Sequence, residues 1–464
     1  MPAPDLPTSQ LKSNLQGQLI IPTDAAYDAA RAVWNGMIDK RPRLIVQCAG
    51  EKDVETALQF ARAHNLLVAV RGGGHNVAGL ATCDDGIVID LSPMKGIQVD
   101  PVARTARAQA GLTWGEFDQA TQRHALATTG GLVSTTGIAG FTLGGGFGWL
   151  VRKYGLTVDN LCAVEMVLAD GSCLKASASE NPELFWAVRG GGGNFGIVTS
   201  FTYQLHPVGP QVYGGAIFHP VSRAKEFLRF YRDWTRTLPD ELSTMFAFLI
   251  APPAPFVPKE LVGTPMVAVA LCYTGASSDG EKTVQPLRSF APPAIDLVGP
   301  IPYLALQTMF DATAPKGIHA YWKTQYLSDL TDPAIATLVE HSARLTQLSP
   351  FSAVHVHHWE GAVARVKPGE TAFANRSARY VLNVLGLWTA GESADHHIRW
   401  VRSFSDAAAA LSTGHAYLNF LSDEGEDRVR AAYDPAAWSR LSQLKRRYDP
   451  GNFFRVNQNI RPGS

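Results

Sequence analysis

The first part of the chain alternates short apolar runs with amphipathic stretches. Leu44–Cys48 and Leu66–Arg71 are apolar runs of strand length, and between them Asp53–His64 places its apolar residues on one face of a helix. Upstream, Ala25–Met37 has the spacing of an amphipathic helix. Because a strand, a helix and a second strand follow one another, this region favours a nucleotide-binding type of fold.

Further short elements follow up to residue 205. The alternation in Thr105–Gly111 is typical of a half-exposed strand, and the apolar run Leu161–Ala169 ends at an Asp-Gly turn. The remaining predicted elements are strands at Gly86–Leu91 and Ile197–Leu205 and helices at Trp114–Arg123 and Glu183–Val188.

The pattern changes near His206–Pro210. From there to about Leu411, apolar strands alternate with amphipathic helices, and Pro-rich loops interrupt them. This mixture predicts a second α+β region built on an antiparallel sheet. Its predicted strands are Met266–Tyr273, Ala353–His358 and Ala378–Leu387, and its predicted helices are Ser222–Thr235, Ala334–Gln347 and Ala394–Ala410.

Three glycine-rich stretches interrupt the first part, at Arg71–Asn76, Gly144–Gly148 and Gly190–Gly196. Backbone without Cβ atoms adopts positive φ angles and lets a ligand approach closely. One such stretch alone is also explained by a tight turn with an incidental histidine, His75. Three of them indicate a large, flat or phosphate-bearing ligand bound by main chain.

The third stretch formally matches G-x-G-x-x-G, but its context excludes a dinucleotide fingerprint. A helix precedes the glycines and a strand follows, whereas that fingerprint needs strand, glycines and helix in this order. Amides of such a loop still bind anions such as a pyrophosphate.

Composition narrows the class of protein. The 464 residues carry 41 Lys and Arg against 41 Asp and Glu, which argues against binding to nucleic acid or to an anionic membrane. No run approaches the roughly 18 apolar residues of a membrane span, and Met1–Asn14 is polar, unlike a secretion signal. Five cysteines without a C-x-x-C pair favour a cytoplasmic protein with buried thiols over a disulfide framework or a zinc site.

At its motifs the chain resembles the berberine-bridge-enzyme-like FAD-linked oxidases, within the vanillyl-alcohol-oxidase and p-cresol-methylhydroxylase (PCMH) flavoprotein superfamily. The matching segments are Arg71–Asn76, Gly144–Asn160, Gly193–Gly196, Tyr417–Asn419 and Tyr448–Ile460. The resemblance implies a two-domain α+β flavoprotein: a PCMH-type FAD-binding domain (residues 1–205), an antiparallel-sheet substrate domain (206–411), and a C-terminal segment (412–464) that returns to the FAD-binding domain.

The resemblance also implies covalent FAD. In the family, the histidine of the first motif is bonded to the flavin, which corresponds to His75. Some relatives form a second bond through a cysteine, where this chain has Val133, so a single link is expected. Cys162 lies in an apolar run and is predicted to be a core thiol.

The other residues that the resemblance places around FAD come from the same motifs. Among them, Thr136 is expected beside the flavin, where its small side chain leaves room for dioxygen. The predicted cofactor-binding set is Arg71, Gly72, Gly73, Gly74, His75, Asn76, Gly79, Val133, Thr135, Thr136, Gly137, Gly140, Gly144, Gly145, Gly146, Gly148, Leu150, Gly155, Leu156, Asp159, Asn160, Gly193, Asn194, Gly196, Val198, Tyr417, Asn457 and Asn459.

Two residues are predicted to take part in catalysis, Tyr417 and Asn419. They lie in Ala416–Leu421, which alternates like a strand, so both side chains are expected on one face. In the family this tyrosine acts as, or assists, the base that removes a substrate proton. A tyrosine ordinarily titrates near 10, so its phenolate needs a stabilising partner.

These features predict an FAD-dependent oxidase that takes a hydride from an alcohol or amine carbon of a sugar, natural product or other small molecule and reduces dioxygen to hydrogen peroxide. A dehydrogenase of the same fold and a non-catalytic flavin-binding protein are the alternatives. His355 and His357 share a strand face and invite a metal site, but no acidic or thiol partner has matching spacing, so no metal is predicted. The oligomeric state is left open.

Overall fold

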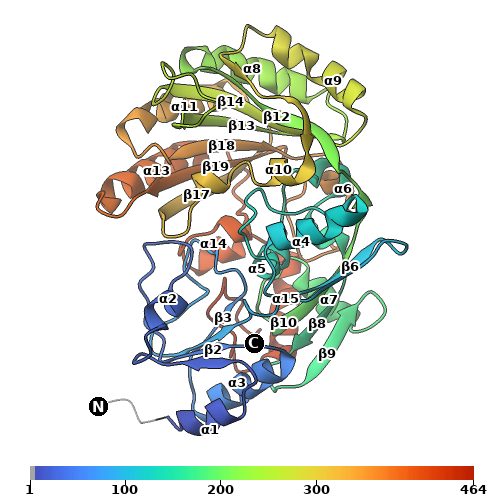
Figure 1. The fold of residues 1–464 in the computed structure, drawn as a ribbon, viewed down its shortest axis with the longest axis vertical. Helices are drawn as coiled ribbons and strands as arrows, with labels where there is room; N and C mark the ends of the chain where they lie inside the picture. Colours follow the sequence, from blue (N-terminus) through green and yellow to red (C-terminus); the bar gives the residue numbers. More distant parts are fainter. Residues whose placement is uncertain (1–5, 464) are drawn as a thin grey trace.

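The computed structural model describes residues 6–463, so part of the polar segment Met1–Asn14 lies outside the described residues. The chain is arranged in two parts, drawn one above the other in Figure 1. The lower part holds the N-terminal elements and the C-terminus, and the upper part holds the large sheet of the middle of the chain. The boundaries at 205 and 411 remain predictions.

A small mixed sheet lies at the base of the lower part. Its strand order is β1 (Gln18–Ile20), β2 (Leu44–Gln47), β4 (Ile87–Asp90) and β3 (Val68–Arg71). Strands β2, β4 and β3 are parallel, and α3 (Glu51–Ala63) connects β2 to β3. The predicted strand–helix–strand unit is therefore confirmed.

An antiparallel sheet stands beside it. Its order is β5 (Ile97–Asp100), β6 (Thr105–Gln109), β10 (Ile197–Gln204), β8 (Leu161–Val167) and β9 (Cys173–Ser177). A two-stranded ladder joins β7 (Leu126–Ala127) to β11 (His206–Pro207). The helices of this part are α1 (Thr8–Ser13), α2 (Tyr27–Arg31), α4 (Trp114–Thr121), α5 (Ile138–Leu143), α6 (Val151–Tyr154) and α7 (Pro182–Val188).

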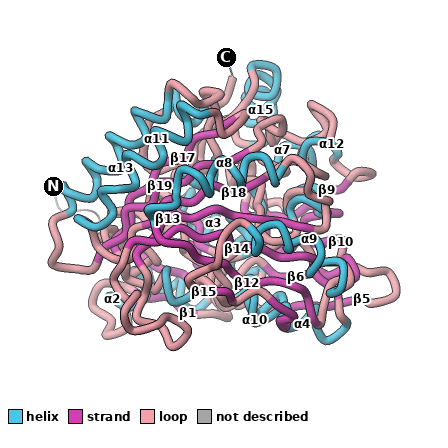
Figure 2. Tube along the Cα trace, turned by 90° about the horizontal axis from the view of Figure 1, so that it is seen from above, coloured by secondary structure: helices cyan, strands magenta, loops and turns pink. Residues whose placement is uncertain are grey.

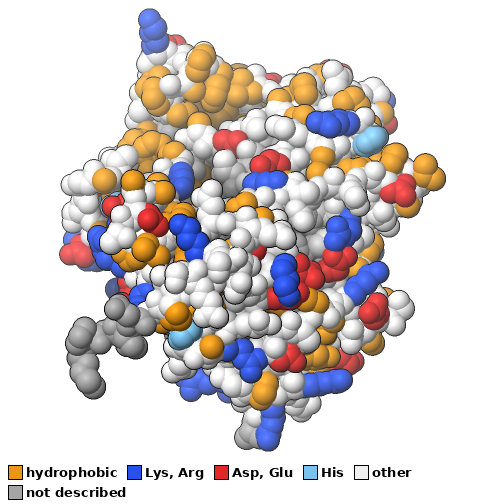
Figure 3. Space-filling model, turned by 60° about the horizontal axis from the view of Figure 1, so that its bottom comes forward, with side chains coloured by type: hydrophobic (Ala, Val, Ile, Leu, Met, Phe, Trp, Pro, Cys, Tyr) orange, Lys and Arg blue, Asp and Glu red, His pale blue; other side chains and the backbone are white. Residues whose placement is uncertain are grey.

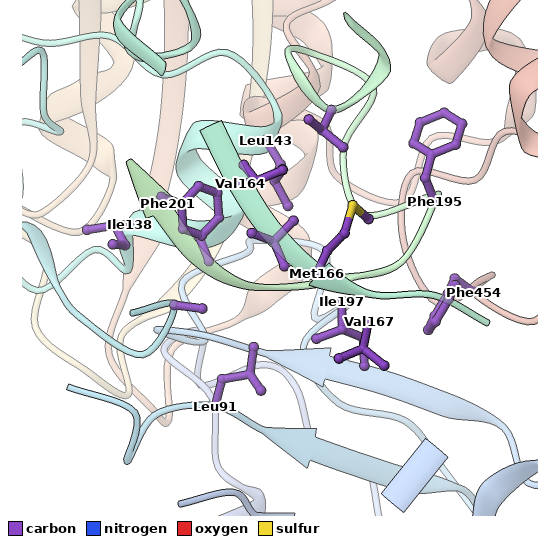
Figure 4. Close-up of a cluster of buried hydrophobic side chains, with 14 of the residues drawn as sticks. Leu91, Ile138, Leu143, Val164, Met166, Val167, Phe195, Ile197, Phe201 and Phe454 are labelled. Carbon is purple, nitrogen blue, oxygen red and sulfur yellow. The ribbon is translucent and has the colours of Figure 1, made fainter. Parts of the chain in front are cut away.

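The core of the lower part forms where these sheets, α5 and the C-terminal tail meet (Figure 4). Apolar side chains from distant segments fill it, and burying each one stabilises the fold by roughly 1.5–3 kcal/mol. The labelled members are Leu91, Ile138, Leu143, Val164, Met166, Val167, Phe195, Ile197, Phe201 and Phe454.

The upper part is one antiparallel sheet. Its order is β15 (Ile295–Asp296), β12 (Gln211–Pro220), β14 (Pro265–Tyr273), β13 (Leu242–Ile250), β18 (Ala353–His358), β19 (Tyr380–Trp388) and β17 (His319–Leu327), and β16 (Gly299–Pro302) also pairs with β12. The predicted α+β fold class, with an antiparallel sheet in the middle of the chain, is confirmed.

Four helices cover the outer face of this sheet (Figures 1 and 2). They are α8 (Ala224–Thr235), α9 (Ser277–Ser289), α11 (Asp332–Ser342) and α13 (Ala394–Ala409). On α8 the spacing of Phe227, Leu228 and Tyr231 turns three fully buried side chains toward the strands. The inner face meets the lower part. The short helix α10 (Tyr303–Gln307) packs against this inner face, and α12 (Ala362–Arg365) lies against α6.

The C-terminal segment packs against the lower part through α14 (Glu426–Arg430) and α15 (Pro435–Tyr448). On α15, the buried Lys445 ammonium pairs with Asp449 and donates to the carbonyl oxygens of Asn194 and Phe454, with all three distances between 2.7 and 2.8 Å. This link holds the chain end beside the third glycine-rich stretch.

Buried polar contacts join the two parts. The Gln307 amide of α10 donates to Asp118 of α4 at 2.7 Å, and burial raises the pKa of this carboxyl group to about 7. The Asn35 side chain donates to the carbonyl oxygens of Val77 and Ala320 at 2.8 and 2.9 Å. The two parts therefore meet as a fixed interface.

Three local predictions are wrong. Ala25–Met37 is helical only at Tyr27–Arg31, because Asn35 bridges the two parts instead of continuing a helix. Ala416–Leu421 is not a strand; it contains the 3-10 turn Leu418–Phe420. Cys162 is exposed because it points away from the core on β8, and Cys173 is exposed as well.

Acidic and basic side chains are intermingled on the face shown in Figure 3. This matches the balanced composition of the chain. Among residues 6–463, no helix combines the length and the apolar character needed to cross a membrane.

Candidate active site

A cavity of about 830 Å³ lies between the two parts. Such a volume is at the upper end of the range for ligand sites. Its lower wall consists largely of main chain, which we call the glycine wall: Gly72, Gly73, Gly74, Gly137, Gly140, Gly144, Gly192, Gly193 and Gly196. Its upper wall, which we call the roof, consists of the cavity-facing side chains of β12, β13, β14, β18 and β19 together with Trp322 of β17.

Close backbone packing explains why glycines make this wall. A Cβ atom on Gly73 would lie 2.5 Å from the Cα atom of Gly137, so the first and second glycine-rich stretches touch as bare backbone. A Cβ atom on Gly144 would lie 2.0 Å from the Asn419 Oδ1 atom. Larger residues at these positions would push the loops apart.

The predicted site residues divide into two groups. The first group lines the cavity and consists of Gly72, Gly73, Gly74, His75, Asn76, Val133, Thr136, Gly137, Gly140, Gly144, Gly193, Gly196, Val198, Tyr417, Asn419 and Asn457. The second group lies outside the lining and consists of Arg71, Gly79, Thr135, Gly145, Gly146, Gly148, Leu150, Gly155, Leu156, Asp159, Asn160, Asn194 and Asn459.

Several residues of the second group support the lining. Arg71 and Asp90 form a buried ion pair at 2.7 Å directly before the first glycine-rich stretch. Asp159 accepts two hydrogen bonds from Arg376, at 2.9 and 2.7 Å, and so ties the segment after the second stretch to the upper part. The Asn194 amide oxygen accepts from the Ile460 N–H at 2.9 Å, which fixes the chain end.

His75 lies at the cavity end of the first stretch. Its ring stacks on Trp34, with 4.5 Å between centroids and 19° between planes, and its Nε2 atom is 3.5 Å from the Thr135 hydroxyl. Enclosure by the protein lowers the pKa of His75 to about 4, so the ring is neutral at pH 7 and keeps a free nitrogen lone pair. Trp34 lies in the wrongly predicted helix, and no sequence signal pointed to its contact with His75.

Tyr417 and Asn419 are brought together by a turn instead of a strand. The hydroxyl oxygen of the buried Tyr417 accepts hydrogen bonds from the Gly146 N–H at 3.0 Å and from Asn419 Nδ2 at 3.1 Å. Burial raises the pKa of Tyr417 well above its ordinary value, and the two donors act in the opposite direction. Both donors are neutral N–H groups that favour a phenolate.

The roof contains polar groups that the sequence only partly indicated. His355 and His357 line the cavity, as the strand alternation predicted, with 5.7 Å between ring centroids. Asn383 interrupts the apolar strand β19 and also lines the cavity; this interruption was its available sequence signal. Among the described residues, the metal-ligand types that cluster within 4.8 Å are Glu51, Glu55 and Cys173, which lie apart from these histidines.

The lining fits a dinucleotide-sized cofactor such as FAD. A Cβ atom on Gly140 or Gly193 would meet no atom within 4 Å, so both residues open directly onto the cavity. Asn457 donates to the Gly193 carbonyl oxygen at 3.0 Å, while its amide oxygen has no partner among the described residues. Main-chain amides and such an acceptor are suited to a pyrophosphate and to ribose or adenine donors.

Comparisons with family models and with known proteins both indicate an FAD-linked oxidoreductase. Residues 42–177 match the family model described as FAD binding domain, and residues 416–461 match the model described as berberine and berberine like. An FAD-linked oxidoreductase of Dictyostelium discoideum is 31% identical over 432 residues, which cover 92% of this chain and 91% of the relative. The (R)-6-hydroxynicotine oxidase of Paenarthrobacter nicotinovorans is 30% identical over 456 residues and 97% of each chain.

Solved structures agree with the observed architecture. The crystal structure of 6-hydroxy-D-nicotine oxidase from Arthrobacter nicotinovorans has a TM-score of 0.87 at 28% identity, covering 97% of this chain and 98% of that one. A carbohydrate oxidase from Microdochium nivale has a TM-score of 0.86 at 22% identity, covering 98% and 99%, and shares the fold.

Proposed function

The chain belongs to the berberine-bridge-enzyme-like family of FAD-linked oxidoreductases, and from this premise we propose that it is an oxidase of a small-molecule alcohol or amine. The proposed reaction removes a hydride from the carbon that bears the hydroxyl or amino group and reduces dioxygen to hydrogen peroxide. Bound FAD would supply the hydride acceptor at N5 and the reaction with dioxygen.

The observation that carries the proposal is the position of Tyr417. Tyr417 lines the same cavity as His75 and the glycine wall, and its hydroxyl oxygen accepts two hydrogen bonds, from the Gly146 N–H and from Asn419 Nδ2. Loss of a hydride from an alcohol carbon leaves positive charge unless the hydroxyl proton departs. A base within hydrogen-bond reach therefore lowers the barrier.

The two N–H donors to Tyr417 stabilise its phenolate form, which is the proposed base. Burial alone disfavours the phenolate, since no solvent reaches the oxygen. Gly146 belongs to the second glycine-rich stretch. Asn419 is held in place by a hydrogen bond that its Nδ2 donates to the Phe141 carbonyl oxygen at 2.8 Å. These donors partly offset the effect of burial, and the ionised fraction of Tyr417 would receive the proton of a substrate hydroxyl.

We further propose that FAD is attached through a single bond to His75. The neutral imidazole supplies the nucleophilic nitrogen, and Trp34 fixes the plane of the ring. Val133, at the cavity wall, has no nucleophilic atom for a second bond. Cys162 is outside the cavity lining.

The test of the oxidase assignment measures two half-reactions. We expect substrate to reduce the flavin without oxygen, and air to reoxidise it with one hydrogen peroxide formed for each dioxygen consumed. Reduced flavin that persists in air would identify a dehydrogenase. Flavin that dithionite reduces but no alcohol or amine of a broad panel reduces would identify a non-catalytic flavoprotein.

The printed names of the relatives leave the substrate class open. One is an oxidase of 6-hydroxynicotine, and one structural neighbour is a carbohydrate oxidase. The substrate class of this chain therefore has to be inferred from the side chains of its own roof.

A further inference from the structure

The cavity-facing side chains of the roof differ in polarity along two rows that cross its strands. Paired positions form a row of cavity-facing side chains across the sheet, in the order Phe218, Ala268, Ala247, His355 and Asn383. A second row runs in the order Ala216, Ala270, Met245 and His357. In these rows the residues of β12, β14 and β13, which we call the apolar half, are apolar, and His355, His357 and Asn383 of β18 and β19, which we call the polar half, are polar. Other cavity-facing residues of β18 and β19 are apolar: Ala353, Leu385 and Leu387.

The apolar half of the roof is open and continues to the rim of the cavity. Its alanines leave room above the glycine wall because their side chains are short. Pro252, Pro253 and Phe310 extend the apolar lining. At the rim, Phe256 and Leu297 are 44% and 39% exposed, so a molecule that enters meets apolar surface first.

Phe147, which also lines the cavity, connects the polar half to Tyr417. Phe147 contacts both the His357 ring and the Tyr417 ring, with centroid distances of 4.9 and 5.3 Å. Among residues 6–463, neither His355 nor His357 forms a hydrogen bond with another protein group. The buried Asn383 amide oxygen also has no partner within that range. These groups are free to bind one polar end of a substrate.

The described lining of the cavity offers no charged side chain that could pair with an ionic substrate. Within residues 6–463, the cavity lining contains no Asp, Glu, Lys or Arg side chain. Burial lowers the pKa of His355 to about 4 and that of His357 well below its ordinary value, so both rings are neutral at pH 7. A buried cation without a partner is strongly disfavoured.

We propose that the substrate is a neutral alcohol with an apolar body. Its hydroxyl group lies between Tyr417 and the His355, His357 and Asn383 side chains, and its carbon skeleton lies under β13, β14 and β12. This inference rests on the proposed oxidase function and narrows it, since a protonated amine finds no carboxylate. An oligosaccharide would leave most of its hydroxyl groups unpaired against alanine and phenylalanine.

The test compares binding of three probes to the flavin-loaded enzyme without oxygen. They are 2-tetralol, the cationic 2-aminotetralin with the same carbon skeleton, and cellobiose. Binding is followed by the change in flavin absorbance and by calorimetry at pH 7. We expect 2-tetralol to bind at least about tenfold more tightly than either other probe.

A matched pair of variants in the apolar row tests the cause of this preference. Ala247→Asp places a carboxylate beside His355, and Ala247→Asn places a neutral side chain of nearly equal size there. We expect the affinity for 2-aminotetralin relative to 2-tetralol to be at least about tenfold higher in Ala247→Asp than in Ala247→Asn. Flavin content and melting temperature establish that both variants fold.

Three results would overturn the inference. The first is that 2-aminotetralin or cellobiose binds the native enzyme as tightly as 2-tetralol. The second is that 2-tetralol does not bind up to its solubility limit, and the third is that both Ala247 variants show the same ratio of affinities. If the preference holds but neutral alcohols never reduce the flavin, the cavity still selects neutral apolar alcohols as ligands, and the proposed oxidase function fails.

Discussion

The glycine wall and the roof enclose one cavity but are built in different ways. The wall is made mostly of main chain, and its contacts, such as Gly73 on Gly137, depend on missing side chains. The roof is made of side chains whose neighbours are set by strand pairing, such as Ala247 beside His355. Substitutions on the roof can therefore change the substrate while the cofactor cradle stays intact.

The glycine wall and the roof also differ in the interactions that stabilise them. The wall is anchored by buried charge, through Arg71 with Asp90 and through Lys445 with Asp449. The roof is anchored by the apolar contacts between its strands and α8, α11 and α13 on the far side of the sheet. Changes to the wall are expected to affect cofactor retention, and changes to the roof are expected to affect substrate binding.

The largest expected effect is the complete loss of covalent flavin in His75→Ala. Native protein should stay yellow after acid precipitation, and mass spectrometry should find one flavin-bearing peptide, which contains His75. The variant should retain FAD without a covalent bond, because the glycine wall is unchanged, and should release it in acid. A flavin-bearing peptide that contains Val133 or Cys162 would contradict the single link.

A second prediction concerns the anchor of the wall. Arg71→Met should lower the free energy of unfolding by about 3–5 kcal/mol, because it leaves the Asp90 carboxylate buried without its partner. Chemical denaturation measures this, and flavin content should fall with it. Arg107→Met, in the exposed pair with Glu165, is the control and should cost no more than about 1 kcal/mol. Equal losses in the two variants would contradict the anchoring role.

The sequence predicted the wall far better than the roof. Each glycine-rich stretch is contiguous, so its bare backbone and the His75 that follows could be recognised without knowing tertiary contacts. Tyr417 and Asn419 were paired correctly for a wrong reason, since a 3-10 turn and not a strand joins them.

The roof depends on register, which one sequence does not specify. Ala247 and His355 are paired across β13 and β18, although more than a hundred residues separate them in the chain. Strand β13 is apolar on both faces, so alternation could not show which side chains face the cavity. The contact of Trp34 with His75 was missed for a similar reason, because Asn35 is fixed by tertiary bonds to distant segments.

A third prediction tests the chemistry where wall and roof meet. Tyr417→Phe removes one oxygen and little volume, so folding and colour should persist, and reduction by substrate should slow by at least about a hundredfold. The pKa of Tyr417 is raised, so the native phenolate fraction, and with it the reduction rate, rises with pH below that pKa. The variant should lose this rise.

Stopped-flow reduction without oxygen over a pH series measures both effects. A variant that reduces at the native rate would move the base elsewhere, to His355 or His357 of β18, which line the cavity. A variant that loses its flavin would show that the hydroxyl is structural, through its bonds to Gly146 and Asn419.

The smallest expected effect concerns dioxygen at the glycine wall. Thr136 lines the cavity immediately before Gly137, and its small side chain leaves space there. Thr136→Leu fills this space with a branched apolar group, while Tyr417 and the roof are untouched. Reoxidation by air should slow by about tenfold, which corresponds to about 1.4 kcal/mol in the barrier, and reduction without oxygen should stay near native. Thr136→Ser, which keeps the space open, is the control and should reoxidise at the native rate. If Thr136→Leu reoxidises as fast as Thr136→Ser, dioxygen reaches the flavin by another route, and the wall then contributes cofactor binding alone at this position.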